Sequence, residues 1–424
     1  MKLETIALHH GYESEKTTKA ATTPIYQTSS FTFDNTQHGA DLFDLKVEGN
    51  IYTRIMNPTN AVLEQRVAEM EGGIASLALA SGMAAITASI QCITRAGDNI
   101  VSTNQLYGGT YNLFAHTFPQ QGINVKMVDA GDFDAIDSAI DDKTKALYCE
   151  SIGNPLGNIV DLKELATIAH RHNIPLIVDN TVPTPYLCKP FDFGADVVIH
   201  SLTKYIGGHG TTIGGIIVDS GKFDWAKEPK KYPMLNEPDP SYHGVVYTEA
   251  LGPAAFIGRC RVVPLRNTGA ALSPNSAFLI MQGLETLGLR MERHCDNALA
   301  LAKFLESHEQ VDWVNYGALP NDKYNANCKK ITQGKASGII SFGITGGIKA
   351  GTKFIDALQI ILRLVNIGDA KSLACHPAST THRQLNPEEL KAAGVSEDMV
   401  RISVGIEHID DIISDVKQAL ETAK

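Results

Sequence analysis

The sequence lacks the short motifs that identify several common classes of enzyme. No GxxxxGK(S/T) phosphate-binding loop occurs, and the glycine-rich segment GGHGTTIGG does not have the dinucleotide spacing GxGxxG. The seven cysteines are scattered along the chain without any Cys-x-x-Cys pair. An odd, unclustered set of cysteines indicates reduced thiols, as in a cytoplasmic protein, rather than a disulfide framework.

Positive charge and uninterrupted apolar runs are also scarce. The formal net charge of −10 argues against nucleic acid as a partner. The first residues, MKLETIALHHGYESEK, contain acids and no apolar run, so they do not resemble a secretory signal peptide. Residues 74–94 hold no charge over 21 positions, but serine, glycine, threonine and glutamine interrupt them. A short strand, a Ser-Gly turn and a buried helix are therefore predicted there, and no membrane span.

Strand and helix patterns alternate through the middle of the chain. Apolar runs that are typical of buried strands occur at IASLAL, NIVST, NVKMVD, TKALYC, PLIVD, DVVIH and GGIIVD. Helical segments such as LKELATIAHRHN separate most of these runs. We therefore expect an α/β fold with a mostly parallel sheet and helices on both of its faces.

The patterns divide the chain into three parts. Residues 1–57 have no strong periodicity and are predicted to be an arm that lies on another surface. Residues 58–287 form the large domain, in which the stretch 222–270 is rich in Pro, Lys and Tyr and is interpreted as an inserted loop region. A long helix over about 275–306 then leads into a smaller C-terminal α/β domain, residues 288–424. Its strands are expected at SGIISFGI and MVRISVG, and its last helix at IDDIISDVKQALETA.

Polar side chains stand at the ends of two predicted strands. PLIVD ends in Asp179, and ADVVIH is followed by Ser201, Thr203 and Lys204. The carboxyl ends of parallel strands meet at one edge of a sheet, so these side chains are expected to lie close together. An amine for a Schiff base, an acid for a pyridinium nitrogen and small donors for a phosphate are what pyridoxal phosphate (PLP) requires. For Asp179 alone, the alternative is a cap on the next segment.

Further residues are candidates for binding the cofactor or the substrate, and most of them also have a purely structural interpretation. Gly82 and Met83 follow a strand and open a helix, where backbone N–H groups bind anions, although a plain strand–helix turn has the same pattern. Tyr107, before Gly-Gly, either stacks on the cofactor ring or belongs to a turn. Asn154 follows the strand TKALYC and is a candidate donor to the ring hydroxyl. Arg401 lies in an apolar strand and needs an anion, which is either a substrate carboxylate or an internal salt-bridge partner.

Metal and nucleotide sites are not predicted. His170 and His172 are two residues apart on a helix and face different ways, and His376 and His382 bracket PAST without a recognisable spacing. A nucleotide-dependent α/β oxidoreductase is the alternative from another class of enzyme. It would require the dinucleotide fingerprint that the chain lacks.

Longer segments resemble the fold-type I PLP-dependent enzymes of cysteine and methionine metabolism, over essentially the whole chain. They are GNIYTRIMNPTN, ASGMAAI, LYGGTYNLF, VDNT, HSLTKYIGGHGTTIGG, QGLETLGLRMERH, VNIGDAKSLACHPASTTH and VRISVGIE. The resemblance implies a fold-type I PLP-dependent transferase with PLP bound to residues 58–287. It also implies an arm that contacts a neighbouring subunit, a homodimer as the smallest active unit, and a homotetramer.

The resemblance also assigns roles to single residues. Lys204 corresponds to the Schiff-base lysine and general base, Asp179 to the partner of the pyridinium nitrogen, and Tyr107 to the stacking tyrosine. The phosphate binders correspond to Gly82, Met83, Ser201 and Thr203, joined by Tyr52 and Arg54 from the neighbouring subunit's arm, and the substrate-carboxylate site corresponds to Arg401 and Asn366.

Within this family, the chain is most similar to the O-acetylhomoserine sulfhydrylases, also called aminocarboxypropyltransferases. This implies a γ-replacement that converts O-acetyl-L-homoserine and sulfide, or a thiol, to L-homocysteine, or methionine, and acetate. Methionine γ-lyases typically carry a cysteine where this chain has Gly109, and cystathionine γ-synthases usually lack an insertion such as residues 222–262. These two activities are the alternatives within the family.

Overall fold

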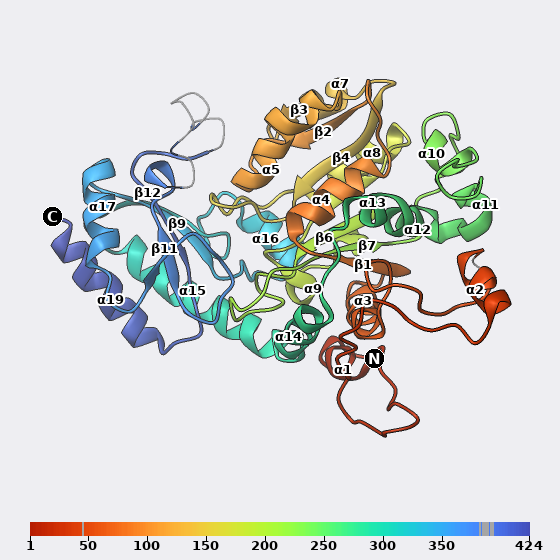
Figure 1. Cartoon of the computed structure of the whole chain (residues 1–424). Helices are drawn as coiled ribbons and strands as arrows, with labels where there is room; N and C mark the ends of the chain where they lie inside the picture. The colour runs from red at the N-terminus through yellow and green to blue at the C-terminus, as the bar shows by residue number, and fades with distance from the viewer. Residues whose placement is uncertain (45, 381–382, 384–389, 391–393) are drawn as a thin grey trace.

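The structure is a computed structural model, which describes residues 1–44, 46–380, 383, 390 and 394–424. A large sheet and a smaller sheet lie side by side, each covered by helices (Figure 1). Among the described residues, no helix is long and apolar enough to cross a bilayer. The segment 74–94 is instead a strand, a turn and a helix, as predicted.

The large sheet is mostly parallel, as the alternation of patterns predicted. In order across the sheet its strands are β1 (Ala75–Leu79), β7 (Gly215–Asp219), β6 (Val197–Ser201), β5 (Leu176–Asp179), β4 (Thr144–Glu150), β2 (Asn99–Thr103) and β3 (Asn124–Val128). Only β7 runs antiparallel to both of its neighbours, β1 and β6. Residues 202–214, which join β6 to β7, contain no helix, so they cannot form the crossover that a parallel pair requires.

Both faces of this sheet are buried, which explains the continuous apolar runs of its strands. On β6, Val198 packs into the core beneath α3 (Pro58–Glu71), whereas Val197 and Ile199 pack into the core beneath α4 (Gly82–Gln91). The other helices of this part are α5 (Gly108–Asn112), η1 (Leu113–Thr117), α6 (Phe118–Gln120), α7 (Phe133–Ala139), α8 (Leu162–Arg171), α9 (Thr184–Leu187) and η2 (Pro190–Phe193).

The arm and the inserted region contain more helix than the sequence indicated. The arm carries α1 (Leu3–His9) and α2 (Thr36–Phe43). The prediction of a loop region over residues 222–270 is wrong from residue 233 on, where the chain forms α10 (Pro233–Asn236), α11 (Tyr247–Leu251), η3 (Gly252–Ala254), α12 (Ala255–Cys260), η4 (Arg261–Leu265) and α13 (Arg266–Thr268). These helices are short and are held by packing, so no long periodic pattern marks them in the sequence.

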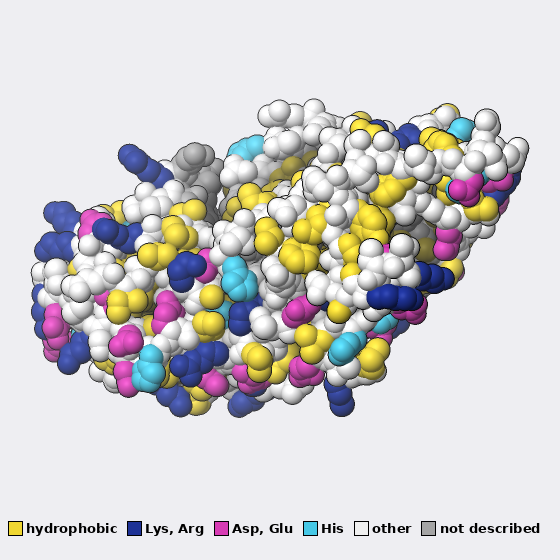
Figure 2. Space-filling model, turned by 60° about the horizontal axis from the view of Figure 1, so that its bottom comes forward, with side chains coloured by type: hydrophobic (Ala, Val, Ile, Leu, Met, Phe, Trp, Pro, Cys, Tyr) yellow, Lys and Arg dark blue, Asp and Glu magenta, His cyan; other side chains and the backbone are white. Residues whose placement is uncertain are grey.

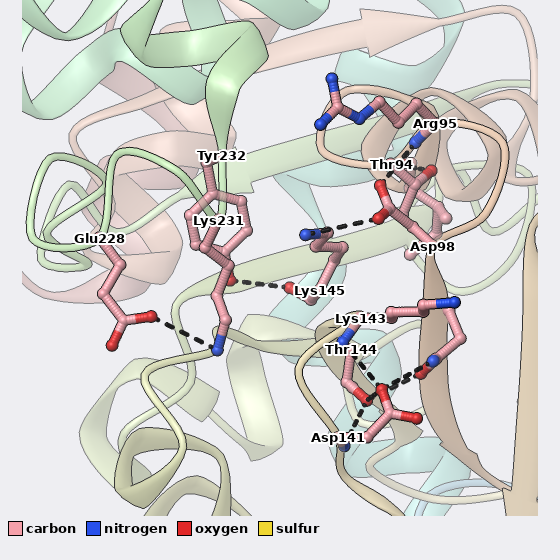
Figure 3. Close-up of polar contacts among 12 residues, drawn as sticks. Thr94, Arg95, Asp98, Asp141, Lys143, Thr144, Lys145, Glu228, Lys231 and Tyr232 are labelled. Carbon is pink, nitrogen blue, oxygen red and sulfur yellow. Dashed lines mark hydrogen bonds and ion pairs between the residues drawn. The ribbon is translucent and has the colours of Figure 1, made fainter.

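Aromatic residues hold the insertion together and attach it to the large sheet. Trp225 stacks on Phe256 with ring centroids 5.1 Å apart and rings 8° from parallel. The Tyr232 hydroxyl donates to the Lys145 carbonyl at 3.0 Å, beside the buried Lys145–Asp98 ion pair (Figure 3). The contacts of Lys145 lie at the amino ends of β2 and β4. The insertion therefore leaves the opposite, carboxyl ends of the strands open.

The smaller sheet has the order β10 (Leu362–Arg363), β11 (Leu373–Cys375), β12 (Met399–Ser403), β9 (Ile339–Ile344) and β8 (Val311–Asn315). All neighbouring pairs are antiparallel except β10 with β11. Its helices are α16 (Asn325–Thr332), α17 (Gly347–Ala357), η5 (Pro377–Ser379) and α19 (Ile409–Thr422). The strands predicted at SGIISFGI and MVRISVG are β9 and β12, and the predicted last helix is α19.

The long helix expected over 275–306 is two helices, α14 (Pro274–Glu285) and α15 (Leu287–Glu306). Thr286 leaves the helical conformation, with φ −108° and ψ 12°. Apolar residues continue across this break, so the sequence pattern does not reveal it. α15 packs against α9 beside the large sheet and against β8, β9 and α19 of the small one. It therefore connects the two sheets.

Candidate active site

A cavity of about 230 Å³ opens at the carboxyl ends of β4, β5 and β6, where ligands of open α/β sheets bind. Helix α4, the loops after β2, β4, β5 and β6, and the loop between β10 and β11 complete its walls. The residues that line it are Ser81, Gly82, Met83, Ile86, Tyr107, Glu150, Ile152, Asn154, Asp179, Thr181, Val182, Ser201, Thr203, Lys204, Ile213, Val365 and Ile367. Eight of the twelve residues singled out in the sequence are in this set, although the chain segments that carry them lie far apart in the sequence.

Helix α4 points its amino end at one wall of the cavity. Ser81 caps the helix, because its side chain accepts a hydrogen bond from the Ala84 N–H at 3.1 Å. The N–H groups of Gly82 and Met83 precede the first intrahelical donors and remain available for an anion. A Cβ atom on Gly82 would meet the Ser201 Cβ at 2.8 Å, so glycine is what allows β6 to approach the helix so closely. This wall has the features of a phosphate cradle.

Two hydroxyl groups support this cradle from the β6 side. The Thr181 hydroxyl accepts a hydrogen bond from the Ser201 N–H at 2.8 Å and fixes the backbone at the end of β6. The Thr203 hydroxyl lies 3.0 Å from the Gly214 N and 3.2 Å from its carbonyl oxygen. Thr181 was not predicted to belong to the site. Its position two residues after Asp179 is the signal that could have identified it.

Lys204 projects into the cavity from the turn that follows β6. Its amine donates to the Asn366 side-chain oxygen, which comes from the loop between β10 and β11. Burial, and secondarily the nearby Arg401 charge, lower the pKa of the Lys204 amine to about 8. A larger fraction of the amine is therefore neutral, and nucleophilic, near neutral pH than for an exposed lysine.

Two acids stand on neighbouring strands in the same cavity. Asp179 ends β5 and accepts a hydrogen bond from the Thr181 N–H at 2.9 Å, while Glu150 ends β4. Burial raises the pKa of both carboxyls, and the proximity of Asp179 raises that of Glu150 further. Hydrogen bonds to Thr181 and the charge of His200 oppose the shift at Asp179. Asp179 is therefore the better placed of the two to remain ionised.

Glu150 connects two other candidate residues. One of its oxygens accepts the Tyr107 N–H at 2.6 Å, and the other accepts the Asn154 N–H at 3.3 Å. It thereby fixes the backbone on either side of the cavity. The sequence showed Glu150 only as the end of a strand, and no role was predicted for it.

Arg401 approaches the cavity from β12 of the small sheet. Its guanidinium donates to the Asn154 side-chain oxygen at 2.9 Å and to the Asn366 carbonyl at 3.0 Å. The side chain is 3% exposed, and its Nε is buried without a hydrogen-bond partner. Within the described part of the chain no carboxylate pairs with it, so an internal salt bridge does not account for its burial. The arrangement suits an anionic ligand.

Tyr52 and Arg54 do not reach the cavity of their own chain. The Arg54 guanidinium lies 5.4 Å from the centre of the Tyr52 ring and donates to the Arg266 carbonyl. Both residues are in the arm, and the Tyr52 side chain is 42% exposed. A role at a phosphate therefore requires another subunit.

The histidines have ordinary partners. His170 bonds to Asp196 and His172 to Asp137, each at 2.8 Å, and His376 bonds to the Glu397 carbonyl at 2.9 Å. His382 lies outside the described residues. Within the described ranges, no three His, Cys, Asp or Glu side chains gather as a metal site requires.

The donor set of the cavity fits PLP. The amino end of α4 with Ser201 suits a phosphate, Lys204 supplies an amine of lowered pKa, and Asp179 supplies a carboxylate for a ring nitrogen. Tyr107 and Asn154 line the same cavity and are available to the ring. The unpaired Nε of Arg401 leaves a donor for an anionic group of a ligand.

The lowered pKa of Lys204 predicts an unusual reactivity in the protein without cofactor. Competitive acetylation with trace acetic anhydride, quantified by mass spectrometry across pH, measures the fraction of neutral amine. We expect half-maximal reactivity of Lys204 near pH 8, against an ordinary value of 10.5 for free lysine amide as the reference. The sign follows from the shift, because a lower pKa means deprotonation at lower pH. A half-maximum at the reference value would contradict this geometry.

Comparisons with known proteins agree with this site. Residues 4–421 match the family model for Cys/Met metabolism PLP-dependent enzymes. A homocysteine synthase of Schizosaccharomyces pombe is 50% identical, over 99% of this chain and 98% of that protein. An O-acetyl-L-homoserine sulfhydrylase of Leptospira meyeri is also 50% identical, over 99% and 97%.

One solved structure is similar to this chain over its whole length. It is a putative O-acetylhomoserine (thiol)-lyase of Campylobacter jejuni that carries a pyridoxyl-lysine monophosphate. Its TM-score is 0.97 at 42% identity, and the match covers 99% of this chain and 100% of that one. With its matching family model, and with a cavity whose lining groups suit PLP, this chain belongs to the PLP-dependent enzymes of cysteine and methionine metabolism.

Proposed function

We propose that this protein is an O-acetylhomoserine aminocarboxypropyltransferase, which converts O-acetyl-L-homoserine and sulfide, or a thiol, to L-homocysteine, or methionine, and acetate. The observation that carries the proposal is the full-length similarity, at 50% sequence identity, to a homocysteine synthase and an O-acetyl-L-homoserine sulfhydrylase. The cavity supports it, because it offers a base, a ring-nitrogen partner and a carboxylate site together.

Each side chain has a definable task in such a reaction. When bound, PLP supplies an electron sink for the carbon atoms of the amino acid. Lys204, as a neutral amine of lowered pKa, removes the proton from the α-carbon and later returns it. Asp179 keeps a negative charge in the cavity, and Arg401 orients the substrate by its carboxylate.

The exchange at the γ-carbon requires little acid catalysis. Acetate leaves with the electron pair of the carbon–oxygen bond, and hydrosulfide supplies the pair for the new carbon–sulfur bond. Acetate is a good leaving group, so no strong general acid is required in the cavity. Lys204 is the proposed base for the loss of the α-proton and of a β-proton, and Tyr107, which lines the same cavity, is placed to assist.

The alternatives within the family have less support. A methionine γ-lyase typically carries a cysteine at the position of Gly109. In this chain, a Cβ there would meet the Tyr107 ring at 2.5 Å, so the observed ring position depends on glycine. The insertion over residues 222–262, which cystathionine γ-synthases usually lack, is present and is bonded to β4 through Tyr232. A nucleotide-dependent oxidoreductase is excluded by the family to which the chain belongs.

We further propose that the active unit is a homodimer, which can pair into a homotetramer. The proposed arm, residues 1–57, exposes apolar side chains that a partner would cover: Ile25, Phe33, Phe43, Val47 and Tyr52. Figure 2 shows hydrophobic side chains gathering over the middle of one face, whereas charged side chains gather over the small-sheet part at the left.

We also propose that the chain divides into three parts. They are the arm, residues 1–57, the PLP-binding domain, residues 58–287, and the C-terminal domain, residues 288–424.

Substrate turnover tests the function directly. O-Acetylhomoserine, O-succinylhomoserine and O-acetylserine are compared side by side with sulfide as acceptor, and homocysteine or cysteine is quantified. We expect the highest kcat/KM for O-acetylhomoserine with homocysteine as product. The control Lys204→Ala should lose at least about 10⁴-fold in kcat, roughly 5.5 kcal/mol of transition-state stabilisation. The proposal fails if oxobutyrate release, or cystathionine formation from cysteine, is the faster reaction of the wild type.

Arg401→Lys should weaken binding of the amino acid more than it slows turnover. A point charge cannot reproduce the planar guanidinium, which bonds Asn154 and Asn366 and leaves Nε for the ligand. We expect KM for the ester to rise by about tenfold or more, the loss of one charged hydrogen bond. Arg363→Lys, at an exposed position of the same domain, is the control. If KM and inhibition by simple amino acids stay unchanged, Arg401 is structural.

Mixed dimers test whether Arg54 acts on a neighbouring subunit. Lys204→Ala and Arg54→Ala, each nearly inactive alone, are mixed after dissociation. In a mixed dimer one site carries both lesions, and the other combines an intact Lys204 with an intact Arg54. Random mixing should restore up to about a quarter of wild-type activity.

A mixture of Lys204→Ala with Asp179→Asn is the matched control. Both lesions then fall in the cavity of their own subunit, so neither site of the mixed dimer is intact. No activity should return in that mixture. If mixed dimers of the first pair form and remain inactive, Arg54 does not act across the interface.

A further inference from the structure

Arg290 is a buried arginine that has no acidic partner. It lies in the first turn of α15, immediately after the break at Thr286, and is 5% exposed. Burial lowers the pKa of its guanidinium to about 10. Across the described residues, no ion pair includes it. A guanidinium is costly to bury, so its hydrogen-bond partners indicate what it contributes.

All partners of Arg290 are neutral oxygen atoms. Nη1 donates to the Tyr205 carbonyl at 2.6 Å, and Nη2 donates to the Ile206 carbonyl at 3.2 Å. Nη2 also donates to the Gly283 carbonyl at 2.7 Å, and Nε donates to the Thr286 hydroxyl at 3.3 Å. Tyr205 and Ile206 are the two residues that follow Lys204 in the chain.

A helix-capping role explains only part of this arrangement. A cation near the last carbonyls of α14 stabilises that helix end, and the contacts with Gly283 and Thr286 satisfy this role. It does not require contacts with Tyr205 and Ile206. Those contacts fix the turn that carries Lys204 to the junction of α14 and α15.

The opposite side of this turn is held by the small domain. The Ala370 N–H donates to the Gly208 carbonyl at 2.8 Å, and Asn366 accepts the Lys204 amine. Gly208 allows the guanidinium to pack against the turn, because a Cβ there would meet the Arg290 Nη1 at 2.1 Å. Residues 204–208 are thus held between Arg290 and the loop 366–370. A change on either side would move the amine of Lys204.

We propose that Arg290 is a positioning residue for Lys204, and that its hydrogen bonds to the Tyr205 and Ile206 carbonyls set the place of the reactive amine. It touches neither the cavity nor a substrate, and acts through the backbone of the turn. The inference rests on the assignment of Lys204 as the PLP lysine, which belongs to the proposed function. It does not depend on which ester is the substrate.

The test uses the holoenzyme with Arg290→Lys, which keeps a positive charge but has one nitrogen with three donors and cannot reproduce the four bonds of the planar guanidinium. Two quantities are measured without turnover: the pH titration of the visible absorption of the lysine-bound cofactor, and the rate at which hydroxylamine removes the cofactor. We expect the apparent pKa of the absorption to shift by about half a unit or more, and removal to accelerate about tenfold. Arg293→Lys is the matched control, since Arg293 lies on the same helix, is exposed, and among the described residues donates only to the Glu407 carbonyl.

The two readouts separate positioning from mere stability. A purely structural Arg290 would lower the melting temperature and leave the titration and the removal rate at wild-type values, which overturns the proposal. If Arg290→Lys does not fold, Arg290→Gln decides, because a side-chain amide has two N–H donors and cannot bond the Tyr205, Ile206 and Gly283 carbonyls together. A shift in the same direction supports the proposal, and an unchanged titration and removal rate overturn it. Absence of any lysine-bound absorption in the wild type would instead refute the proposed function.

Discussion

The site depends on the burial of four ionisable side chains at one edge of a parallel sheet. Glu150 and Asp179 end adjacent strands, Lys204 follows the next strand, and Arg401 enters from the small sheet. Among the described residues none of the four forms an ion pair with another. Burial without pairing raises the pKa of the acids and lowers that of the lysine. A cavity with these unpaired charges is built for a ligand that carries complementary ones.

PLP and an amino-acid ester together carry those charges. The phosphate matches the amino end of α4, the ring nitrogen matches Asp179, and the substrate carboxylate matches Arg401. Hydrogen bonds to neutral backbone groups hold the loops of the site in place without neutralising the charges of its side chains. Glu150 fixes the backbone of Tyr107 and Asn154, and Arg290 fixes the turn of Lys204. The protein holds its reactive groups through backbone contacts, and the groups themselves remain available.

Much of the fold and site was accessible from the sequence, because local patterns mark them. The strands of the large sheet are short apolar runs bounded by polar residues, and Asp179 and Lys204 stand where such runs end. Residues that act on the backbone of others were missed. Glu150 and Arg290 have no local pattern, because their partners are backbone atoms brought close by folding. Thr181 also bonds a backbone atom, and only its position two residues after Asp179 marks it in the sequence. The break at Thr286 was missed for a related reason, since apolar spacing continues through it.

The central claim is that Asp179 remains ionised in the cavity and keeps the pyridine nitrogen of PLP protonated. Nitrogen-15 NMR of holoenzyme reconstituted with ring-labelled PLP measures that proton directly, in the wild type and in Asp179→Asn. The wild type should show a protonated ring nitrogen across neutral pH, and the Asp179→Asn variant should show an unprotonated one with the cofactor still bound. The same protonation state in both proteins, or an unprotonated nitrogen in the wild type, would contradict the account.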